Sequence, residues 1–221
     1  MTDISALYRF RFRESDLPRK MRIWRALCKG FFQQFVDPAS TVLDVACGYG
    51  EFINNIQAKR KYAIDLNPDT SRFLNEDVVF GQMPANNMSE IASNSVDFAF
   101  TSNFLEHLES KAICDSVLRE VHRVLAPGGV FVVMGPNIRY LAGAYWDFYD
   151  HHLPLSHLSL QEGLSINGFE VIRNIPKFLP YTTRSLIPQH PAFVTAYLKF
   201  PFAWSILGRQ FLLIARKPAI G

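Results

Sequence analysis

The feature that most constrains the fold is a short apolar run that ends in a glycine-rich turn. Residues 41–45 read TVLDV, the β-branched and apolar composition of a strand that is buried on both faces. The following turn contains Gly48 and Gly50, and glycine lets a backbone adopt positive φ angles and approach a ligand closely. Residues 51–56 are predicted to open a helix. Strand, turn and helix together favour a doubly wound α/β sheet with a nucleotide site at this turn.

A second predicted strand, residues 61–66, supports the same arrangement. It contains Asp65, which lies 21 positions after Asp44, the acid of the first strand. That spacing fits one βαβ unit, with the second acid at a strand tip facing ribose hydroxyls. The dinucleotide fingerprint is incomplete because Ile53 occupies its third glycine position. The chain also lacks a phosphate loop of the form G-x-x-x-x-G-K-[ST].

The remaining elements are predicted from apolar periodicity and from helix-ending residues. A helix is expected from Asp16 to about residue 35, because its apolar side chains recur at steps of four and three. Another begins at a capping box formed by Ser159 and Glu162. A third ends before Pro127. Further strands are predicted at residues 77–80, 96–101, 130–134, 169–172 and 210–215, and a short helix at residues 67–74.

Two segments of this chain together resemble the class I S-adenosylmethionine-dependent methyltransferases of the broad methyltransferase-11/23 type. The first is the strand, acid and small-x-Gly-x-Gly pattern at residues 42–50. The second is V-L-x-P-G-G at residues 124–129, followed by an apolar strand. The resemblance spans about residues 42–171. It implies a Rossmann-like, doubly wound seven-stranded sheet with the last strand antiparallel next to the sixth and helices on both faces. It also implies S-adenosyl-L-methionine as cofactor and S-adenosyl-L-homocysteine as its product.

The resemblance also suggests where the cofactor binds. Asp44 serves the methionine end through the loop, and Asp65 takes the adenosine ribose. The usual first glycine is Ala46, which costs little at negative φ but distorts the turn at positive φ. The other expected contacts lie in the turn and near the tips of the next three strands: Cys47, Gly48, Gly50, Leu66, Gln82, Met83, Ser102 and Asn103.

The substrate pocket is expected in residues 135–152, an aromatic and polar segment that directly follows a strand tip. Its candidate substrate contacts are Tyr145, Trp146 and Tyr149. Methyl transfer needs a base only when the acceptor is a hydroxyl or a protonated amine, and histidine suits that task near neutral pH. The candidate bases are His107, His151, His152 and His157. His107 could instead cap or pack the start of the helix after the fourth strand, and some of the other three could hold loop backbone.

Neither a metal nor a nucleic acid is expected. Glu106 and His107 are similar to part of the E-x-x-E-H element of metal-binding methyltransferases, but Asn103 replaces the first acid and is a poorer ligand. Residues 101–104 lack the N-P-P-[YFW] signature of base-amino methyltransferases. The basic excess is modest, with a net charge of +3.

Length and composition indicate one folded domain over residues 1–221. Hydrophobic residues make up 48% and charged residues 19% of the chain, a balance typical of globular proteins. We expect an N-terminal helical cap over 1–40, a cofactor-binding half over 41–135, and a substrate-side insertion with C-terminal strands over 136–221. The three cysteines contain no C-x-x-C pair, which favours reduced thiols over a disulfide framework or a zinc site.

Residues 1–40 are basic, with eight Lys or Arg against four Asp or Glu. Residues 8–13 alternate aromatic and basic side chains, as in an arm or a lid. Neither a secretory signal nor a transmembrane helix is expected, which predicts a cytoplasmic protein. The aromatic stretch 191–204 leaves open a peripheral contact with the inner face of a membrane, although core or dimer packing explains it better.

The favoured function is O-methylation of a small hydroxylated or sugar-type acceptor. It rests on residues 150–162 and the terminal G-R-Q-F-L-L-I-A-R-K-P, which look similar to methyltransferases encoded with bacterial glycan and secondary-metabolite enzymes. One alternative is a methyltransferase for a lipid-linked glycan or a quinone precursor. Another is a non-catalytic scaffold protein with the same fold. Monomer and homodimer both remain open.

Overall fold

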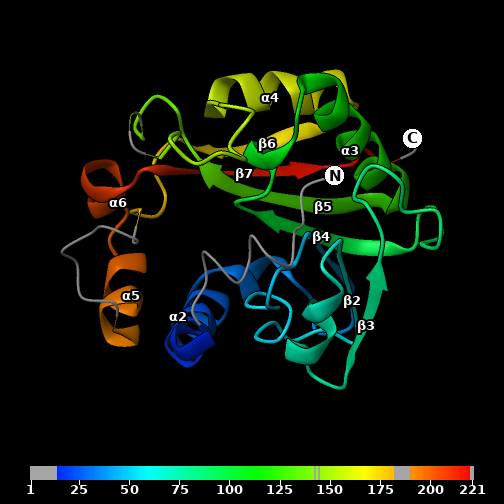
Figure 1. Cartoon of the computed structure of the whole chain (residues 1–221), viewed down its shortest axis with the longest axis horizontal. Coiled ribbons are helices and arrows are strands. Elements are labelled where there is room, and N and C mark those ends of the chain that lie inside the picture. The colour runs from blue at the N-terminus through cyan, green and yellow to red at the C-terminus, as the bar shows by residue number, and fades with distance from the viewer. Residues whose placement is uncertain (1–13, 142, 144, 182–189, 220–221) are drawn as a thin grey trace.

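A computed structural model describes residues 14–141, 143, 145–181 and 190–219 (Figure 1). Within them, a seven-stranded sheet has the order β3-β2-β1-β4-β5-β7-β6. Strands β1 to β5 are parallel, whereas β7 is antiparallel to both β5 and β6. This order confirms the predicted fold class. The strands are β1 Thr41–Val45, β2 Arg60–Asp65, β3 Val78–Gln82, β4 Val96–Ser102, β5 Leu125–Pro136, β6 Glu170–Ile175 and β7 Gln210–Arg216.

Helices cover both faces of the sheet (Figure 1). Helices α3 and α4 lie on one face, and α2 lies on the other with α5 beside it. The α-helices are α2 Leu17–Gly30, α3 Lys111–Val124, α4 His157–Ile166, α5 Pro191–Leu198 and α6 Pro201–Leu207. Short 3-10 helices are η1 Glu14–Asp16, η2 Phe32–Phe35, η3 Pro68–Phe73 and η4 Leu105–His107.

Strand alternation divides the apolar core into two clusters, one on each face of the sheet. Along β7, Phe211, Leu213 and Ala215 pack into one cluster. Leu212 and Ile214 pack into the other. Burial on both faces explains why these strands read as continuous apolar runs.

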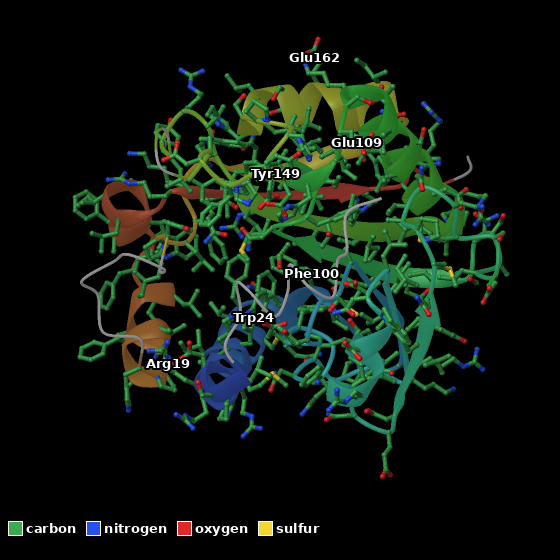
Figure 2. The ribbon with its side chains drawn as sticks, in the orientation of Figure 1. Arg19, Trp24, Phe100, Glu109, Tyr149 and Glu162 are labelled. Carbon is green, nitrogen blue, oxygen red and sulfur yellow. The ribbon has the colours of Figure 1, made fainter. Side chains whose placement is uncertain are left out.

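The predicted helix that starts after Asp16 is shorter than expected. It ends at Gly30, and the chain continues as the separate 3-10 helix η2. The apolar stripe nevertheless faces the sheet: the Trp24 ring contacts Phe32 at 6.2 Å and Phe100 at 5.9 Å between centroids (Figure 2). Residues 8–13, the predicted arm or lid, lie outside the described residues.

The helix predicted at residues 51–56 is wrong. The segment forms turns, in which the Asn54 N–H donates to the Gly50 carbonyl at 3.0 Å and the Asn55 and Ile56 N–H groups donate to the Phe52 carbonyl at 2.9 and 3.1 Å. The Asn54 side chain instead donates to the Phe73 carbonyl at 2.8 Å and accepts from the Asn75 N–H at 2.9 Å. These side-chain hydrogen bonds hold the turns against residues 73–75.

The predicted capping box lies one turn too late. Helix α4 begins at His157, and the Ser156 hydroxyl accepts from the Ser159 N–H at 3.1 Å. The Ser159 hydroxyl in return accepts from the Ser156 N–H at 2.9 Å. Ser159 therefore completes the box in the role that the prediction gave to Glu162.

Strand β5 starts earlier than predicted. Leu125 pairs with Val96, and the register shifts before Val130 pairs with Phe98. Gly128 lies within this irregular part with a φ of 82°, and its N–H donates to the Lys217 carbonyl at 2.9 Å. The proline and glycines therefore form a bulged entry to the strand as well as ending α3.

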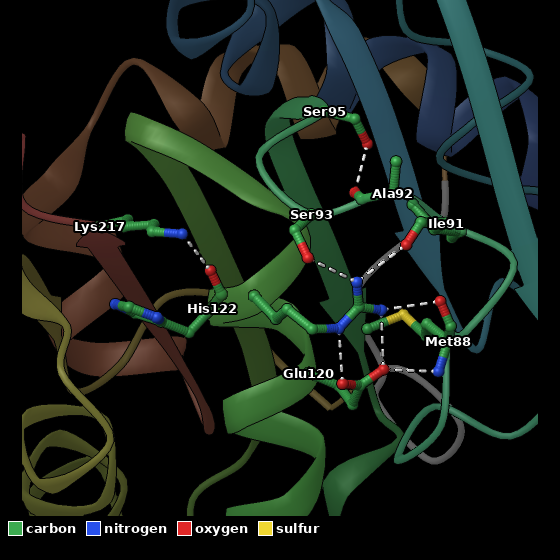
Figure 3. Close-up of polar contacts among 9 residues, drawn as sticks. Met88, Ile91, Ala92, Ser93, Ser95, Glu120, His122 and Lys217 are labelled. Carbon is green, nitrogen blue, oxygen red and sulfur yellow. Dashed lines mark hydrogen bonds and ion pairs between the residues drawn. The ribbon is translucent and has the colours of Figure 1, made fainter.

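Arg123 joins α3 to the loop that precedes β4 (Figure 3). Its guanidinium donates to the Met88 and Ile91 carbonyls at 2.8 and 2.9 Å and to Glu120 at 2.8 and 3.0 Å. Glu120 also accepts from the Met88 N–H at 2.7 Å. Hydrogen bonds from Arg123 lower the pKa of Glu120, so this carboxylate stays ionised and holds the loop against the helix.

The turn after β1 has a left-handed backbone at three positions, with φ values of 56° at Ala46, 58° at Gly48 and 73° at Gly50. Of the two outcomes considered for Ala46, positive φ is the one observed. A left-handed conformation costs an L-residue with a Cβ about 1–2 kcal/mol. The turn keeps this geometry because the Cys47 N–H donates to the Ile64 carbonyl of β2 at 3.0 Å.

We expect Ala46→Gly to raise the free energy of unfolding by about 1 kcal/mol, because glycine removes the left-handed strain. Urea denaturation followed by circular dichroism measures this change. The matched control is Ala63→Gly, at a fully buried position in β2, which should lower the same free energy by about 1 kcal/mol. Equal losses in both variants would contradict the assignment of strain to Ala46.

Candidate active site

Asp65 ties the tip of β2 to the glycine turn. The side chain is 6% exposed, and its two carboxylate oxygens accept from the Gly48 N–H at 2.9 Å and the Asn67 N–H at 2.8 Å. Burial raises the pKa of Asp65, while these backbone donors oppose the shift. The carboxylate is thus held at the strand tip beside the turn, as the sequence predicted for a group that accepts from ribose hydroxyls.

Two more buried carboxyl groups lie around the same turn. Asp44 is 3% exposed, and burial raises its pKa well above the usual range, reinforced by the charge of Glu51. Burial also raises the pKa of Glu51, whose Oε1 lies 3.9 Å from the Lys20 Nζ. The sequence prediction missed Glu51, although its position directly after Gly50 was the available signal.

Three carboxyl groups lie in and around this turn, and burial raises the pKa of each, so ionising them without a compensating positive charge is costly. Such a site suits a ligand that carries positive charge and hydroxyl donors. Cys47 lies within it, and burial together with these acids raises the pKa of its thiol, so the sulfur stays protonated and unreactive.

The other expected cofactor residues surround this turn at the carboxyl edge of the sheet. Gln82 pairs with Asp65 in the β2–β3 register, and its side chain donates to the carbonyl of Leu66 at 3.3 Å. Met83 is buried, whereas Leu66 is 49% exposed. At the end of β4, Ser102 is half-buried. Asn103 has a φ of 49° and its N–H donates to the Met134 carbonyl at 3.0 Å.

A second polar cluster lies beyond the ends of β4 and β5. The His107 Nδ1 is 3.0 Å from the Asp150 Oδ2, and the His107 and His151 ring centroids are 4.9 Å apart. The His151 Nδ1 lies 2.7 Å from the Tyr145 carbonyl oxygen. Two of the four candidate bases are thus brought together, beside an aspartate that was not among the predicted site residues.

Glu106 links this cluster to the segment after β5. It is 3% exposed, and its Oε1 accepts from the Tyr145 hydroxyl at 2.6 Å. Its main-chain carbonyl accepts from the N–H groups of His152 and Leu153 at 2.8 and 3.0 Å. Burial raises the pKa of Glu106, which the charge of His107 and the Tyr145 hydroxyl oppose. A small pocket lies alongside, lined by Leu105, Glu106, Met134, Gly135, Pro136, Leu153, Leu155 and Phe211.

The remaining candidates lie apart from this cluster or at its margin. The His152 side chain is exposed, and Tyr149 is 88% exposed. His157 is buried in α4, with its Nδ1 2.8 Å from the Asn137 Nδ2, and burial lowers its pKa. The Trp146 indole donates to the Leu141 carbonyl at 2.8 Å. The sequence does not distinguish these residues from His107 and His151, because all of them lie in polar segments that follow strands. Only the folded structure shows which of them come together.

A family model described as a methyltransferase domain matches residues 43–133. The human thiol S-methyltransferase TMT1A is 32% identical over 114 residues, covering 46% of this chain and 46% of the relative. The chain therefore aligns with less than half of that relative's length.

Solved structures share the fold over nearly the whole chain. A methyltransferase from Archaeoglobus fulgidus, described as SAM dependent, superposes with a TM-score of 0.67 at 19% identity, covering 97% of this chain and 100% of that one. A putative methyltransferase from Haloferax volcanii, solved with the activator Trm112, gives 0.71 at 16% identity, covering 99% of both chains. At these identities the structures show the fold alone. Together with the family model over residues 43–133, they support a class I S-adenosylmethionine-dependent methyltransferase.

Proposed function

We propose that the protein transfers the methyl group of S-adenosylmethionine to the oxygen of a small hydroxylated or sugar-type acceptor. The observation that carries the proposal is the position of two polar clusters at one edge of the sheet. The acidic turn follows β1, and His107 follows β4, which pairs with β1 in parallel. Carboxyl ends of neighbouring parallel strands meet at the same edge, where such sheets bind their ligands.

The acidic turn supports the cofactor part of the proposal. Asp65 accepts hydrogen bonds from the ribose hydroxyls, while Asp44 and Glu51 offset the positive charges of the ammonium and sulfonium groups. Gly48 and Gly50 let the backbone approach the ligand without a Cβ in the way.

The histidine cluster supports an oxygen acceptor. The acceptor oxygen attacks the methyl carbon, the carbon–sulfur bond breaks, and its electron pair stays on sulfur, which gives neutral S-adenosylhomocysteine. The hydroxyl proton must leave during this displacement, and His107 or His151 is placed to take it. Alignment of oxygen, methyl carbon and sulfur supplies much of the acceleration.

We expect Asp65→Asn to weaken S-adenosylmethionine binding about 10–100-fold, because hydrogen bonds to a charged group contribute about 1.5–3 kcal/mol. Since burial raises the pKa of Asp65, wild-type affinity should fall on acidification at a higher pH than for an ordinary aspartate. Calorimetric titration with S-adenosylmethionine and S-adenosylhomocysteine measures both effects.

The control is Asp69→Asn, at a partly exposed position in η3, which should leave the affinity unchanged. If folded wild-type protein bound neither ligand, the enzyme proposal would fail. The non-catalytic scaffold would then become the better explanation.

A thiol is the second candidate acceptor, favoured by the similarity to a protein named as a thiol S-methyltransferase. A thiol has a pKa of about 8.5 and reaches its reactive anion without much help, whereas an aliphatic hydroxyl depends strongly on a base. The two acceptors therefore make different demands on the histidines.

We expect His107→Gln and His151→Gln to lower the kcat for hydroxyl acceptors by about 100-fold or more, with unchanged S-adenosylmethionine affinity. If the wild-type protein methylates a small thiol such as 2-mercaptoethanol, the kcat for that thiol should fall far less in these variants than the kcat for hydroxyl acceptors. Rates come from S-adenosylhomocysteine production across a panel of simple sugars, phenols and thiols. The exposed His152→Gln is the control, and an equal loss in this variant would argue against a base at His107 or His151.

A lipid-linked acceptor remains an alternative because α5 and α6 expose aromatic side chains. Phe193, Phe200 and Phe202 are 56%, 65% and 79% exposed. Trp204 was expected at the same interface but is 5% exposed, packs against Phe178 at 5.1 Å and donates to the Tyr197 carbonyl at 2.9 Å. Trp204 is therefore a core residue. No helix among the described residues is long and apolar enough to cross a membrane.

We expect the protein to co-sediment with vesicles containing anionic lipids, and Phe202→Ala to reduce the bound fraction several-fold. The phenyl ring buries its area in the headgroup region, while basic residues of the neighbouring α2 contribute electrostatic attraction. Leu158→Ala is the control, because Leu158 is also half-exposed but lies on α4. No binding to vesicles, or equal loss in both variants, would remove the lipid-linked alternative and the peripheral location with it.

A further inference from the structure

We propose that His107, Asp150 and His151 form a binding site for a divalent transition-metal ion. One potential ligand atom from each side chain lies within 4.8 Å of the others, and all three residues are half-buried. Among the residues that the structure describes, no other group of three or more His, Cys, Asp or Glu side chains meets this geometry. No metal was expected from the sequence, because Asn103 replaces the first acid of the E-x-x-E-H element. Asp150 and His151 lie more than 40 positions after His107, so local spacing does not bring the three together.

One pair of the potential ligand atoms is spaced like two ligands of a single ion. Two atoms bound to one tetrahedral ion at about 2.0–2.1 Å lie about 3.3 Å apart. The His107 Nδ1 and the Asp150 Oδ2 are 3.0 Å apart, close to that value. Little rearrangement is therefore needed for both side chains to face one cation. The Asp150 carbonyl oxygen, which can only accept a hydrogen bond, lies 3.1 Å from the same nitrogen, so a bound ion would displace a proton from that nitrogen.

The orientation of His151 provides a second argument. Its Nδ1 lies 2.7 Å from the carbonyl oxygen of Tyr145, which can only accept a hydrogen bond. The proton therefore resides on Nδ1, and the lone pair is on Nε2. A backbone carbonyl that accepts from one ring nitrogen is the usual outer support of a metal-binding histidine, because it fixes both tautomer and ring orientation.

The surrounding groups hold the two chain segments together and supply negative charge. Hydrogen bonds from the His152 and Leu153 N–H groups to the Glu106 carbonyl join the segment after β4 to the segment after β5. The Tyr145 hydroxyl joins the same segments through the Glu106 carboxylate. With Asp150, this places two carboxyl groups near the proposed ion, and a cation offsets their mutual repulsion.

The donor set indicates which ions fit. Two imidazoles with one carboxylate suit Zn²⁺, Co²⁺, Mn²⁺ or Fe²⁺, whereas Mg²⁺ and Ca²⁺ take oxygen ligands almost exclusively. Three protein ligands leave at least one coordination position for another molecule, as in catalytic metal sites. The role of that position, holding an acceptor oxygen and lowering the pKa of its hydroxyl, rests on the proposed function. Binding of the ion itself does not. In the metal-bound protein this position would take the place of a histidine base, because an imidazole whose lone pair binds the ion cannot also accept the hydroxyl proton.

The test uses the full chain, stripped with a chelator and titrated without substrate. Visible absorption follows Co²⁺, and equilibrium dialysis measures Zn²⁺. We expect one equivalent to bind, with affinity about 10-fold or more weaker in Asp150→Asn and in His151→Gln. The matched control is His152→Gln, which removes an exposed neighbouring imidazole outside the cluster and should leave the affinity unchanged.

Three results would overturn the inference: no saturable binding of either ion to folded wild-type protein, wild-type affinity in both cluster variants, or an equal loss in His152→Gln. Circular dichroism confirms that each variant is folded, and Asp150→Asn preserves the side-chain volume. Calorimetry with S-adenosylmethionine separates the two proposals. Cofactor binding without metal binding overturns only the metal site, whereas metal binding without cofactor binding overturns only the proposed function.

Discussion

The hydrogen bond from the Gly48 N–H to the Asp65 carboxylate, 2.9 Å long, is the contact on which the cofactor end of the molecule depends. It fixes the turn after β1 against the tip of β2, and the left-handed φ of Gly48 presents the N–H to the carboxylate. The same carboxylate accepts from the Asn67 N–H, which starts the connection toward β3. One buried acid thus positions three consecutive segments, and any ligand of the turn meets a preformed surface rather than a flexible loop.

Much of the fold was predictable because parallel strands buried on both faces are continuous apolar runs. β1, β4 and β7 were therefore located within a residue or two of their observed bounds. The errors arose where local side chains overrule periodicity. After the glycine turn, Asn54 ties its segment to the chain beyond β2 with side-chain hydrogen bonds, and the segment forms turns in place of the predicted helix. Ser156 competes successfully with Ser159 as the cap of α4, because both serines satisfy each other's N–H groups. Neither the missing helix after the glycine turn nor the cap of α4 can be read from the hydrophobic pattern.

The two halves of the site differed in how much the sequence revealed. The residues of the acidic turn lie within a strand–turn–strand unit, so spacing alone brings Asp44 near Asp65. The proposed acceptor side depends on a non-periodic segment after β5, which hydrogen bonds to Glu106 hold in place. Residue type alone therefore made four histidines candidate bases and gave no ground for choosing among them. Only the tertiary structure shows that His157, at the start of α4, is buried against Asn137, whereas the His151 ring contacts the His107 ring.

The acidic turn also links ligand binding to stability. Burial raises the pKa values of Asp44, Glu51 and Asp65 above those of the unfolded chain. At neutral pH the unfolded chain ionises these groups more easily than the fold does, so they lower the stability of the ligand-free protein. The penalty disappears as the pH falls through the folded-state pKa values toward the ordinary carboxyl range. A cationic ligand removes it at neutral pH by offsetting the buried charge, and such a ligand binds the folded state alone. The strain at Ala46 and the buried charge are thus costs of a preorganised turn, which binding of S-adenosylmethionine would offset.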